Sequence, residues 1–516
     1  MRVQNNPEKM LDDASHHEDV PQGTTTDVHR QKTTLYMLVF SFWVGTFGWL
    51  ANFDAAFGGI VLIMDSYKRA FGTCVGDVCS LTPLQQSLVQ LTILFVSGGG
   101  ALSAIVGDRF GRRGTLQVAC LIIAVSAGGM MGTAGSFTNY MVCKCIGGLG
   151  IGMIYSAAPT WGSESVNPGK RGFLMSFYNV GLALGNVVAG AVCLGSSSFS
   201  TDWAWRTPIF CQIPAAIILG LLTLCFHESP RWLLTKGKTD AARRSFAKFN
   251  KKELESPVIT ALIEEVNRHI ELERALRQSS TWTGIFRGND GKRTHIAVLA
   301  LLGNAITGVQ FVIPYTALFL AQIGLTQPFA LNVAISASVL IGTVPGPFLC
   351  EWVGRRRSLL AGYSAMGASM LIFAATATGL GQSSHTAQSV LVAFLCFWAF
   401  VFGATSGPIA WVASAEMHSL RMRTFGQSYA VSVYGLFSFG AAFWTPYMLN
   451  AEYGNMGTNV GYFYFAITVV VIILTFLIIP ETGRLSLEQI DEHFESGRPA
   501  WKTSLMLNKR IASGKN

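Results

Sequence analysis

The sequence predicts an all-α membrane protein in which two halves of six transmembrane helices are joined by a helical insert on the cytoplasmic side. Three observations predict this fold class. Only 13% of the 516 residues are charged and half are hydrophobic, whereas a soluble chain of this length needs a more charged surface. The apolar residues gather in runs of about 20 residues, the length that crosses a bilayer. Motifs of the first half return about 250 residues later, as in a duplicated transporter.

The clearest repeated motif is Gly-Asp-Arg-Phe-Gly-Arg-Arg-Gly at 107–114, between two apolar runs. Such a short segment cannot cross a bilayer, so we expect a tight hairpin in which Gly107 and Gly111 permit the sharp turn. Asp108 can cap the next helix. The arginines place the hairpin on the cytoplasmic side, and the pattern returns at 351–357.

The apolar runs set the expected order of elements. In the first half they lie at 35–60, 84–107, 115–134, 139–160, 172–195 and 206–226, and in the second half at 295–321, 329–351, 358–380, 388–412, 424–449 and 458–480. We therefore expect a disordered cytosolic tail at 1–33, a first half at 34–226, a cytoplasmic helical linker at 227–294, a second half at 295–480 and a cytosolic tail at 481–516. Within the linker, 236–252 is strongly basic and 260–277 has helical spacing, which predicts short amphipathic helices.

The charge balance and the cysteines exclude some functions. Lys and Arg outnumber Asp and Glu by 38 to 29, but they sit between apolar runs, as cytoplasmic loops require. No zinc-finger spacing, metal cluster or arginine-rich arm is present, so we expect neither a metal site nor a nucleic-acid partner. Cys74 and Cys79 share a polar segment that this topology places outside, where either a local disulfide or two free thiols would fit.

Two further repeats lead to a resemblance. Glu164 followed by Arg171 corresponds to Glu416 followed by Arg423, and Glu228-Ser-Pro-Arg corresponds to Pro-Glu481-Thr-Gly-Arg. With these motifs the chain, from about residue 35 to about residue 503, resembles the sugar porter branch of the major facilitator superfamily, closest to the fungal α-glucoside (maltose) permeases. The resemblance implies the major facilitator fold with twelve transmembrane helices. It also implies a sugar substrate moved by alternating access, the proton as coupling ion and no other cofactor. We expect a monomer in the plasma membrane.

A charge inside a membrane span is costly and marks a functional hypothesis. Asp54, in the first span, matches the aspartate of many proton-coupled sugar porters, and its natural partner is Lys144, where the family usually has arginine. Lysine keeps the charge but loses the bidentate fork. The alternative is a structural ion pair that holds the two helices together.

The resemblance assigns a second group of residues to a cytoplasmic gate, whose ion pairs hold the cytoplasmic ends together when the cavity faces outward. Partly exposed pairs are individually weak, so such a set can break and reform. The alternative is that these residues only set the orientation of the chain in the membrane. This alternative explains the arginines but not the regularly placed glutamates. The gate residues are Asp108, Arg112, Arg113, Glu164, Arg171, Glu228 and Arg231 in the first half, and Arg355, Arg356, Glu416, Arg423, Glu481 and Arg484 in the second.

The third group is the expected sugar site, since sugars are bound by amides and aromatic platforms. It comprises Asn179, Asn304, Gln310, Tyr315, Trp411 and Tyr434. The match to glucose porters is partial, because Asn304 and Gln310 replace family residues and Asn179 replaces a glutamine. These departures favour the α-glucoside subgroup. Any of the amides, Asn304 above all, could instead bond to a neighbouring helix. Before Trp411, Gly407-Pro408 predicts a helix break.

Three other functions compete with proton-driven sugar uptake. The same fold could move another polar metabolite, by facilitated diffusion or by efflux. A non-transporting sugar sensor would carry a longer cytosolic extension than the short segment after Pro480. An enzyme would need a nucleophile–base pair or a metal cluster, and the sequence shows neither.

Overall fold

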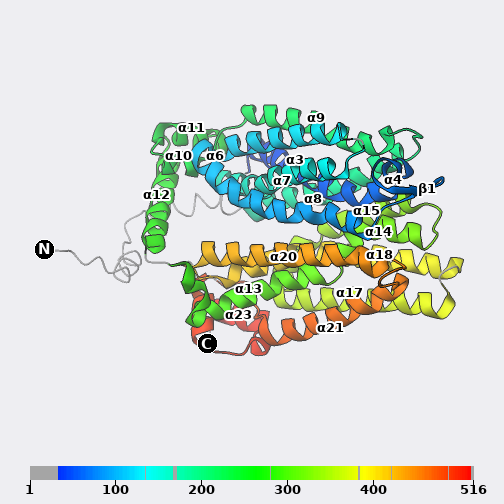
Figure 1. The fold of residues 1–516 in the computed structure, drawn as a ribbon. Helices are drawn as coiled ribbons and strands as arrows, with labels where there is room; N and C mark the ends of the chain where they lie inside the picture. Colours follow the sequence, from blue (N-terminus) through cyan, green and yellow to red (C-terminus); the bar gives the residue numbers. More distant parts are fainter. Residues whose placement is uncertain are drawn as a thin grey trace.

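The computed structural model describes residues 33–133, 135–166, 171–278, 281–381, 384–419, 421–485 and 487–512. The expected N-terminal tail therefore lies outside the described residues, except for residue 33. The spans run side by side in two groups, one formed mainly by the first half of the chain and one mainly by the second, and α11 (Thr239–Asn250) and α12 (Pro257–Gln278) lie across one end (Figure 1).

The first half follows the predicted runs. Its long helices are α3 (Leu35–Ile60), α6 (Thr92–Met131), α7 (Phe137–Ser165), α8 (Arg171–Ser196) and α9 (Trp203–Leu222). The shorter elements are η1 (Val61–Ile63), α4 (Asp65–Phe71), β1 (Thr73–Val75), β2 (Val78–Ser80), α5 (Pro83–Leu88), η2 (Val89–Leu91) and η4 (Thr223–Cys225).

Helix α6 contains two spans, because its backbone breaks at Gly111 (φ 83°). The part before Gly111 packs parallel to α7 and the part after it packs antiparallel, so the chain reverses there. The contacts are Thr92 with Gly148 and Val96 with Gly152 before the break, and Ile123 with Gly150 and Ser126 with Gly147 after it. The predicted hairpin is therefore confirmed.

The insert is helical, as predicted, with α10 (Pro230–Thr235), α11 (Thr239–Asn250), α12 (Pro257–Gln278) and η5 (Trp282–Phe286). The second half contains α13 (Gly288–Ile306), α14 (Val309–Gln322), α15 (Pro328–Thr343), α16 (Gly346–Trp352), α17 (Arg355–Leu380), α18 (His385–Ala404), α19 (Ser406–Met417), α20 (Arg423–Leu449), η6 (Gly457–Asn459) and α21 (Val460–Ile478). The C-terminal segment forms α22 (Leu487–Glu495), η7 (Ala500–Lys502) and α23 (Leu505–Ala512).

Three spans that the sequence predicts as continuous are interrupted in the second half. The run at 295–321 starts earlier, at Gly288, and breaks at Gly308, whose φ of 107° does not continue a helix. The run at 329–351 breaks before Pro345, which cannot donate the helical hydrogen bond. The run at 388–412 breaks at Thr405, just before the predicted Gly407-Pro408.

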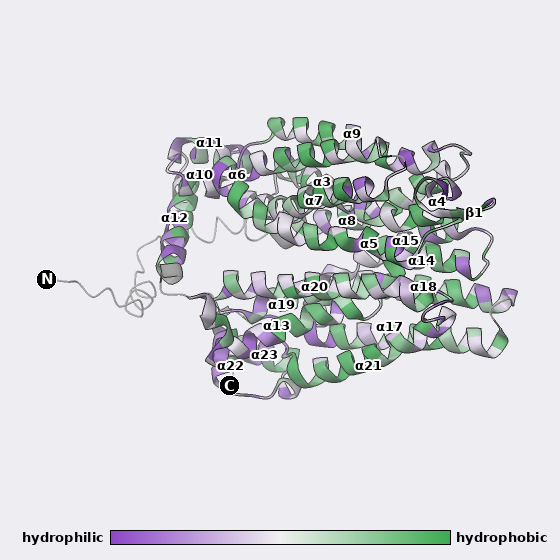
Figure 2. Ribbon diagram, in the orientation of Figure 1, coloured by the Kyte–Doolittle hydropathy of each residue, from purple (hydrophilic) through white to green (hydrophobic). Residues whose placement is uncertain are grey.

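Ten helical segments in the described part are long and apolar enough to cross a membrane. One of them contains both parts of α6, and α20, at the place of the eleventh predicted span, is not among the ten. Hydrophobic residues follow the long helices, whereas hydrophilic residues gather on α11, α12 and α22 at one end (Figure 2). This is the end that carries the arginine hairpins, so it is the cytoplasmic end.

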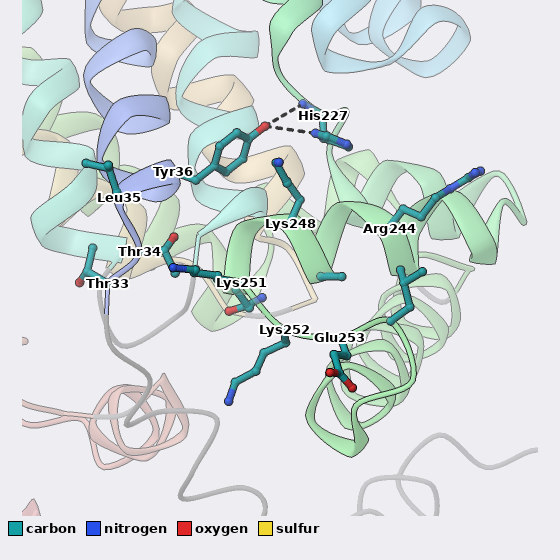
Figure 3. A pocket seen from close by; sticks show the side chains of 13 residues that line it. Thr33, Thr34, Leu35, Tyr36, His227, Arg244, Lys248, Lys251, Lys252 and Glu253 are labelled. Carbon is teal, nitrogen blue, oxygen red and sulfur yellow. Dashed lines mark hydrogen bonds between the residues drawn. The ribbon is translucent and has the colours of Figure 1, made fainter.

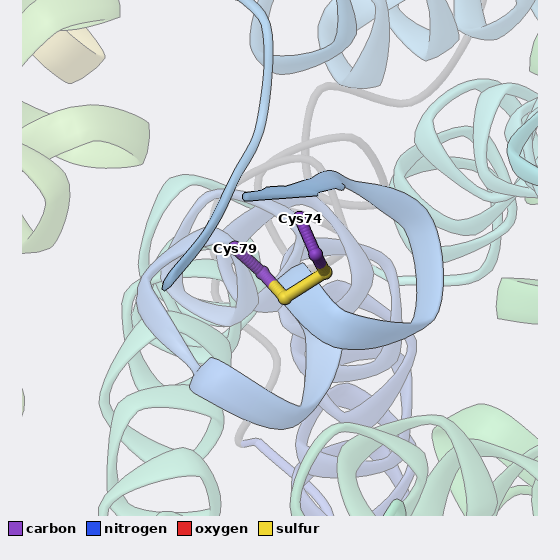
Figure 4. Close-up of a disulfide and its surroundings, with 2 residues drawn as sticks. All are labelled: Cys74 and Cys79. Atoms are coloured by element: carbon purple, nitrogen blue, oxygen red, sulfur yellow. A yellow bond between two sulfur atoms is a disulfide. The ribbon is translucent and has the colours of Figure 1, made fainter. Parts of the chain in front are cut away.

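At the opposite end, β1 and β2 form an antiparallel hairpin. Cys74 and Cys79 lie opposite each other in this hairpin and form a disulfide, with their Cα atoms 4.0 Å apart (Figure 4). Of the two alternatives that the sequence leaves open, the structure contains the disulfide.

Candidate functional site

The first cytoplasmic cluster is built around the break at Gly111. Glu228 accepts hydrogen bonds from the backbone N–H groups of Arg112 and Arg113, at 3.1 Å each, which are the first donors of the new helix. A carboxylate is favoured at a helix N-terminus by these free donors and by the helix dipole. Burial raises the pKa of Glu228, and the backbone donors offset part of this rise. A side chain at Gly111 would meet the Glu228 carboxylate, so glycine is required there.

The same cluster continues to the end of α7. The Arg112 guanidinium donates two hydrogen bonds, of 3.0 and 2.9 Å, to the two carboxylate oxygens of Glu164. Ser229 donates a third, of 2.6 Å, from its hydroxyl. This bidentate geometry is among the strong ion-pair arrangements. The cluster thus joins α6, α7 and the chain just before α10.

The second half repeats this arrangement residue by residue. Glu481 accepts from the backbone N–H groups of Arg355 and Arg356, which begin α17 directly after Gly354 (φ 95°). The Arg355 guanidinium binds Glu416 at 2.9 Å, and Thr482 donates to the same carboxylate at 2.6 Å. The repeated motifs in the sequence therefore form the same hydrogen bonds and ion pairs in both halves.

The sequence analysis missed Ser229 and Thr482. The signal was present, since a hydroxyl residue follows the glutamate in both copies of the repeated motif, Glu228-Ser229 and Glu481-Thr482. A hydroxyl is needed there because each carboxylate of the Arg–Glu pairs has acceptor positions that the guanidinium leaves open.

The remaining predicted gate residues lie apart from these two clusters. Asp108 pairs with Lys236 and Arg231 pairs with Glu273, both on the surface. Arg423 and Arg484 are exposed, and the structure describes no ion pair for either. Arg171 opens α8, but its side chain lies outside the described residues.

The ion pairs described for the predicted gate residues each lie within one half or involve the insert, and none of them joins the two halves. The extracellular ends of the two halves, by contrast, touch directly. Ser87 donates to the carbonyl of Phe443 at 2.7 Å, and Gly59 packs against Pro314. These contacts hold the two halves together at the extracellular end, as an inward-facing arrangement requires.

The two charges predicted inside the first half meet. The Lys144 ammonium lies 3.2 Å from the Asp54 carboxylate, and both side chains are at least 95% buried. Lys144 also lies over the ring of Phe57, 4.5 Å from its centre. Gln212 of α9, which the sequence analysis missed, donates to the other Asp54 oxygen at 3.1 Å. Each Asp54 oxygen thus has its own donor, which a buried carboxylate requires.

The residues predicted for the sugar site divide into two sets. Trp411 is 38% exposed and packs edge-on against Tyr434, with the ring centres 5.1 Å apart. Gln310 is half-buried and Asn179 is exposed, and the structure describes no hydrogen bond for either side chain. Asn179 lies on the same face of α8 as Gly190, which contacts α15 of the other half. Trp411, Gln310 and Asn179 are therefore accessible to a ligand.

The other two predicted sugar-site residues are engaged elsewhere. The Asn304 amide is buried and donates to the carbonyl of Ser406 at 2.9 Å, which is the bond between neighbouring helices that the sequence left as an alternative. Tyr315 is fully buried and donates to the carbonyl of Gln86 at 3.1 Å. In this inward-facing structure Tyr315 therefore belongs to the extracellular contact between the halves.

Two further polar residues near the middle of the first half were missed. The Tyr155 hydroxyl donates to Asn52 at 2.6 Å, and Asn52 donates to the carbonyl of Leu182 at 2.8 Å. Both side chains are half-buried. These hydrogen bonds join α3, α7 and α8, so no local pattern in the sequence pointed to them.

A family model described as "Sugar (and other) transporter" matches residues 40–494. The chain belongs to this family. Curated relatives include the probable glucose transporter rco-3 of Neurospora crassa, 28% identical over 90% of this chain and 80% of the relative. They also include the hexose transporter HXT10 of Saccharomyces cerevisiae, 27% identical over 87% and 85% of the two chains. The high-affinity fructose transporter ght6 of Schizosaccharomyces pombe is 28% identical over 91% and 88%.

Solved structures confirm the major facilitator fold of this sugar transporter. The inward-open conformation of the xylose transporter XylE from E. coli matches with a TM-score of 0.73, at 19% identity, over 89% of this chain and 100% of XylE. XylE bound to 6-bromo-6-deoxy-D-glucose matches with a TM-score of 0.70, over 89% and 99%. The protein is thus a multi-pass membrane transporter of sugars and not an enzyme, as the sequence predicts.

Proposed function

We propose that this sugar transporter takes up a hexose across the plasma membrane, driven by protons, as a monomer and without a further cofactor. The hexose is favoured because the relatives described above are named for glucose, hexose and fructose transport. The α-glucoside preference suggested by the sequence is the second candidate. The α-glucoside candidate depends on Asn179 and Gln310, because the structure describes no hydrogen bond for their side-chain amides.

The observation that carries proton coupling is the buried trio of Asp54, Lys144 and Gln212. The carboxylate of Asp54 lies inside the membrane span, with Lys144 on one oxygen and Gln212 on the other. It can take up a proton only if its partner or its hydration changes, and alternating access supplies such a change. The related fold of XylE, which is described as a proton:xylose symporter, also supports proton coupling.

The proposed cycle uses the two cytoplasmic clusters as gates. Each cluster joins one half to the segment that directly follows it in the chain, so each half can move as a rigid body about the sugar. Arg423 and Arg484 are exposed at this end, and we propose that they meet carboxylates of the first half when the cytoplasmic side closes. Such surface pairs contribute roughly 0–1 kcal/mol each, so the closed state remains reversible.

The test is uptake of labelled hexoses and α-glucosides in a yeast lacking its own sugar carriers, with external pH recorded. Asp54→Asn keeps the side-chain volume and imitates the protonated form. If Asp54 carries the proton, the variant loses uphill accumulation and sugar-induced alkalinisation but still exchanges sugar downhill. A structural pair predicts instead low surface expression that is partly rescued by also neutralising Lys144. Accumulation of a hexose against its gradient by Asp54→Asn would overturn the coupling role.

The same panel separates the substrate candidates. Uptake of hexoses but not of maltose supports the proposal, and the reverse result supports an α-glucoside carrier. Lack of uptake of any sugar by a well-expressed wild-type protein would favour a different polar metabolite.

A further inference from the structure

A large open pocket lies on the cytoplasmic face, where the first span leaves the membrane. Its volume is about 1190 Å³, and it is lined by the start of α3, the segment around His227, and α11 with the residues that follow it. Figure 3 shows Lys248 lying between Tyr36 and Arg244, and Lys251 beside Thr34. None of the residues assigned to the coupling site, the sugar site or the gate lines this pocket.

The pocket is strongly basic. Its charged lining consists of Arg244, Lys248, Lys251 and Lys252 against one acid, Glu253. In the described part of the chain none of these four cations is in an ion pair, and all four are exposed. The pKa of His227 is lowered first by its burial and then by Lys248, Arg113 and Arg244. An anion in the pocket would therefore meet several cations whose charge is not neutralised.

The pocket also contains an acceptor without a donor. Asn250 is 6% exposed, and its Nδ2 donates to the carbonyl of Phe246 at 2.9 Å. Its Oδ1 is buried and has no hydrogen-bond partner among the described residues. A bare phosphate brings only acceptors, so it would leave this oxygen unsatisfied, whereas a ligand hydroxyl would satisfy it. Cations beside a free acceptor therefore fit a phosphorylated polyol better than phosphate alone.

The position of the pocket points to a ligand anchored in the membrane. Leu35, Val39 and Phe42 are exposed apolar residues at helical spacing on α3, and Leu35 also lines the pocket. Neighbouring helices cover other faces of α3, since Gly45 packs on Phe177 of α8 and Phe40 packs on Trp161 of α7. An apolar stripe thus leads from the basic pocket along the exposed face of α3.

We propose that this pocket binds the phosphorylated inositol headgroup of an anionic membrane lipid. The phosphates would lie against Lys248 and Lys251, an inositol hydroxyl would donate to Asn250, and one acyl chain would follow Leu35, Val39 and Phe42. Basic pockets beside membrane helices on the cytoplasmic side suit such headgroups. The lipid would bridge α3 and α11, which already touch through the hydrogen bond from the Thr34 hydroxyl to the Phe249 carbonyl.

The test uses the full chain purified into nanodiscs of phosphatidylcholine, with phosphatidylinositol 4,5-bisphosphate as the probe. Lys248→Gln/Lys251→Gln should weaken binding about 30-fold, at about fivefold per lysine. Arg268→Gln/Arg274→Gln removes the same charge from exposed positions of α12 and should change binding less than twofold. Equal loss in both double variants, or equal binding of phosphatidylserine at matched charge, would overturn the proposal, because either result indicates unspecific attraction.

Two further variants test the hydroxyl contact and the source of the headgroup. Asn250→Leu removes the acceptor without adding a charge, so it should weaken binding of the bisphosphate, and a thermal unfolding measurement checks that the variant is folded. Leu35→Ser should weaken binding of the lipid but not of soluble inositol 1,4,5-trisphosphate. Binding of the free trisphosphate as tight as that of the lipid, or lipid binding that is unchanged in Leu35→Ser, would overturn the assignment to a membrane lipid.

Discussion

At the scale of single residues, the pair of Trp411 and Tyr434 is the best placed to contact a sugar. A large aromatic ring that is exposed inside a membrane protein offers its face to the C–H groups of a sugar. Trp411 can do so because the break at Thr405 starts a new helix six residues earlier, and because Tyr434 supports one edge of its ring.

We predict that Trp411→Ala raises the Km for the transported sugar about tenfold, on the scale of one lost stacking contact, with normal surface expression. Trp444→Ala is the matched control. Trp444 is 37% exposed, nearly the same as Trp411, but it packs on Phe463 of α21. Initial-rate uptake over a range of sugar concentrations measures both, and equal effects of the two variants would remove Trp411 from the site.

A second prediction at this scale concerns His418, just beyond the cytoplasmic end of α19. Its pKa is lowered to about 4, first by burial and then by Arg293 and Arg423. Asp290 also faces it and opposes this shift, as does a hydrogen bond with Gln427. Below pH 6.5 His418 therefore binds a proton in the unfolded chain but not in the folded protein. Stability falls by about 1.4 kcal/mol for each pH unit down to about pH 4.

His418→Asn cannot take up that proton, so its apparent Tm in detergent should fall less than that of the wild type between pH 7 and pH 5. Exposed His269 provides the control variant, His269→Asn. The same acid sensitivity in the wild type and in His418→Asn would contradict the role of this histidine.

At the scale of elements, the two carboxylate-capped helix starts explain why the hairpin motifs contain glycine. Gly111 and Gly354 have φ values of 83° and 95° with extended ψ, a region that only glycine enters readily. A Cβ at either position would also lie within 2.5 Å of a carboxylate oxygen, of Glu228 or of Glu481. Backbone conformation and the capping contact thus require the same residue.

We predict that Gly111→Ala and Gly354→Ala each destabilise the protein by at least about 1–3 kcal/mol, the usual cost of such a strained backbone. Gly100→Ala is the control, since this glycine is in α6 and a Cβ there meets no atom within 4 Å. Thermal unfolding in detergent and the yield of monodisperse protein measure the effect. A normal Tm for Gly111→Ala would contradict the requirement for glycine.

At the scale of the whole molecule, several described contacts join the extracellular ends of the two halves. Gly190 of α8 is one of them, with a Cβ position only 3.1 Å from Val333 of α15. Two side chains this close are within the reach of a disulfide. Alternating access requires this contact to open on every cycle.

Gly190→Cys/Val333→Cys should therefore form a disulfide that holds the transporter inward-facing and abolishes uptake under oxidising conditions. A reducing agent should restore uptake. The two single variants control for the substitutions themselves. Wild-type uptake by the oxidised double variant, with the cross-link verified by mass spectrometry, would show that this contact does not open during transport.

The sequence by itself determined the membrane class, the positions of the spans, the helical insert and the duplication. These follow from hydrophobic length, from charge placement and from repeated motifs, which are local properties of the chain. It also identified Asp54 with Lys144, and the arginines and glutamates of both clusters, because charges near apolar runs stand out.

Only the tertiary structure decided which partners those residues have. Gln212 meets Asp54 across 158 residues of chain, and Glu228 reaches Arg112 across 116. The breaks at Gly308 and Thr405, the bond from Asn304 to Ser406 and the closed extracellular side likewise depend on how helices pack. The physical reason is that an amide or a hydroxyl fits many places in a sequence, and its role is set by the neighbour that packing brings within hydrogen-bonding distance.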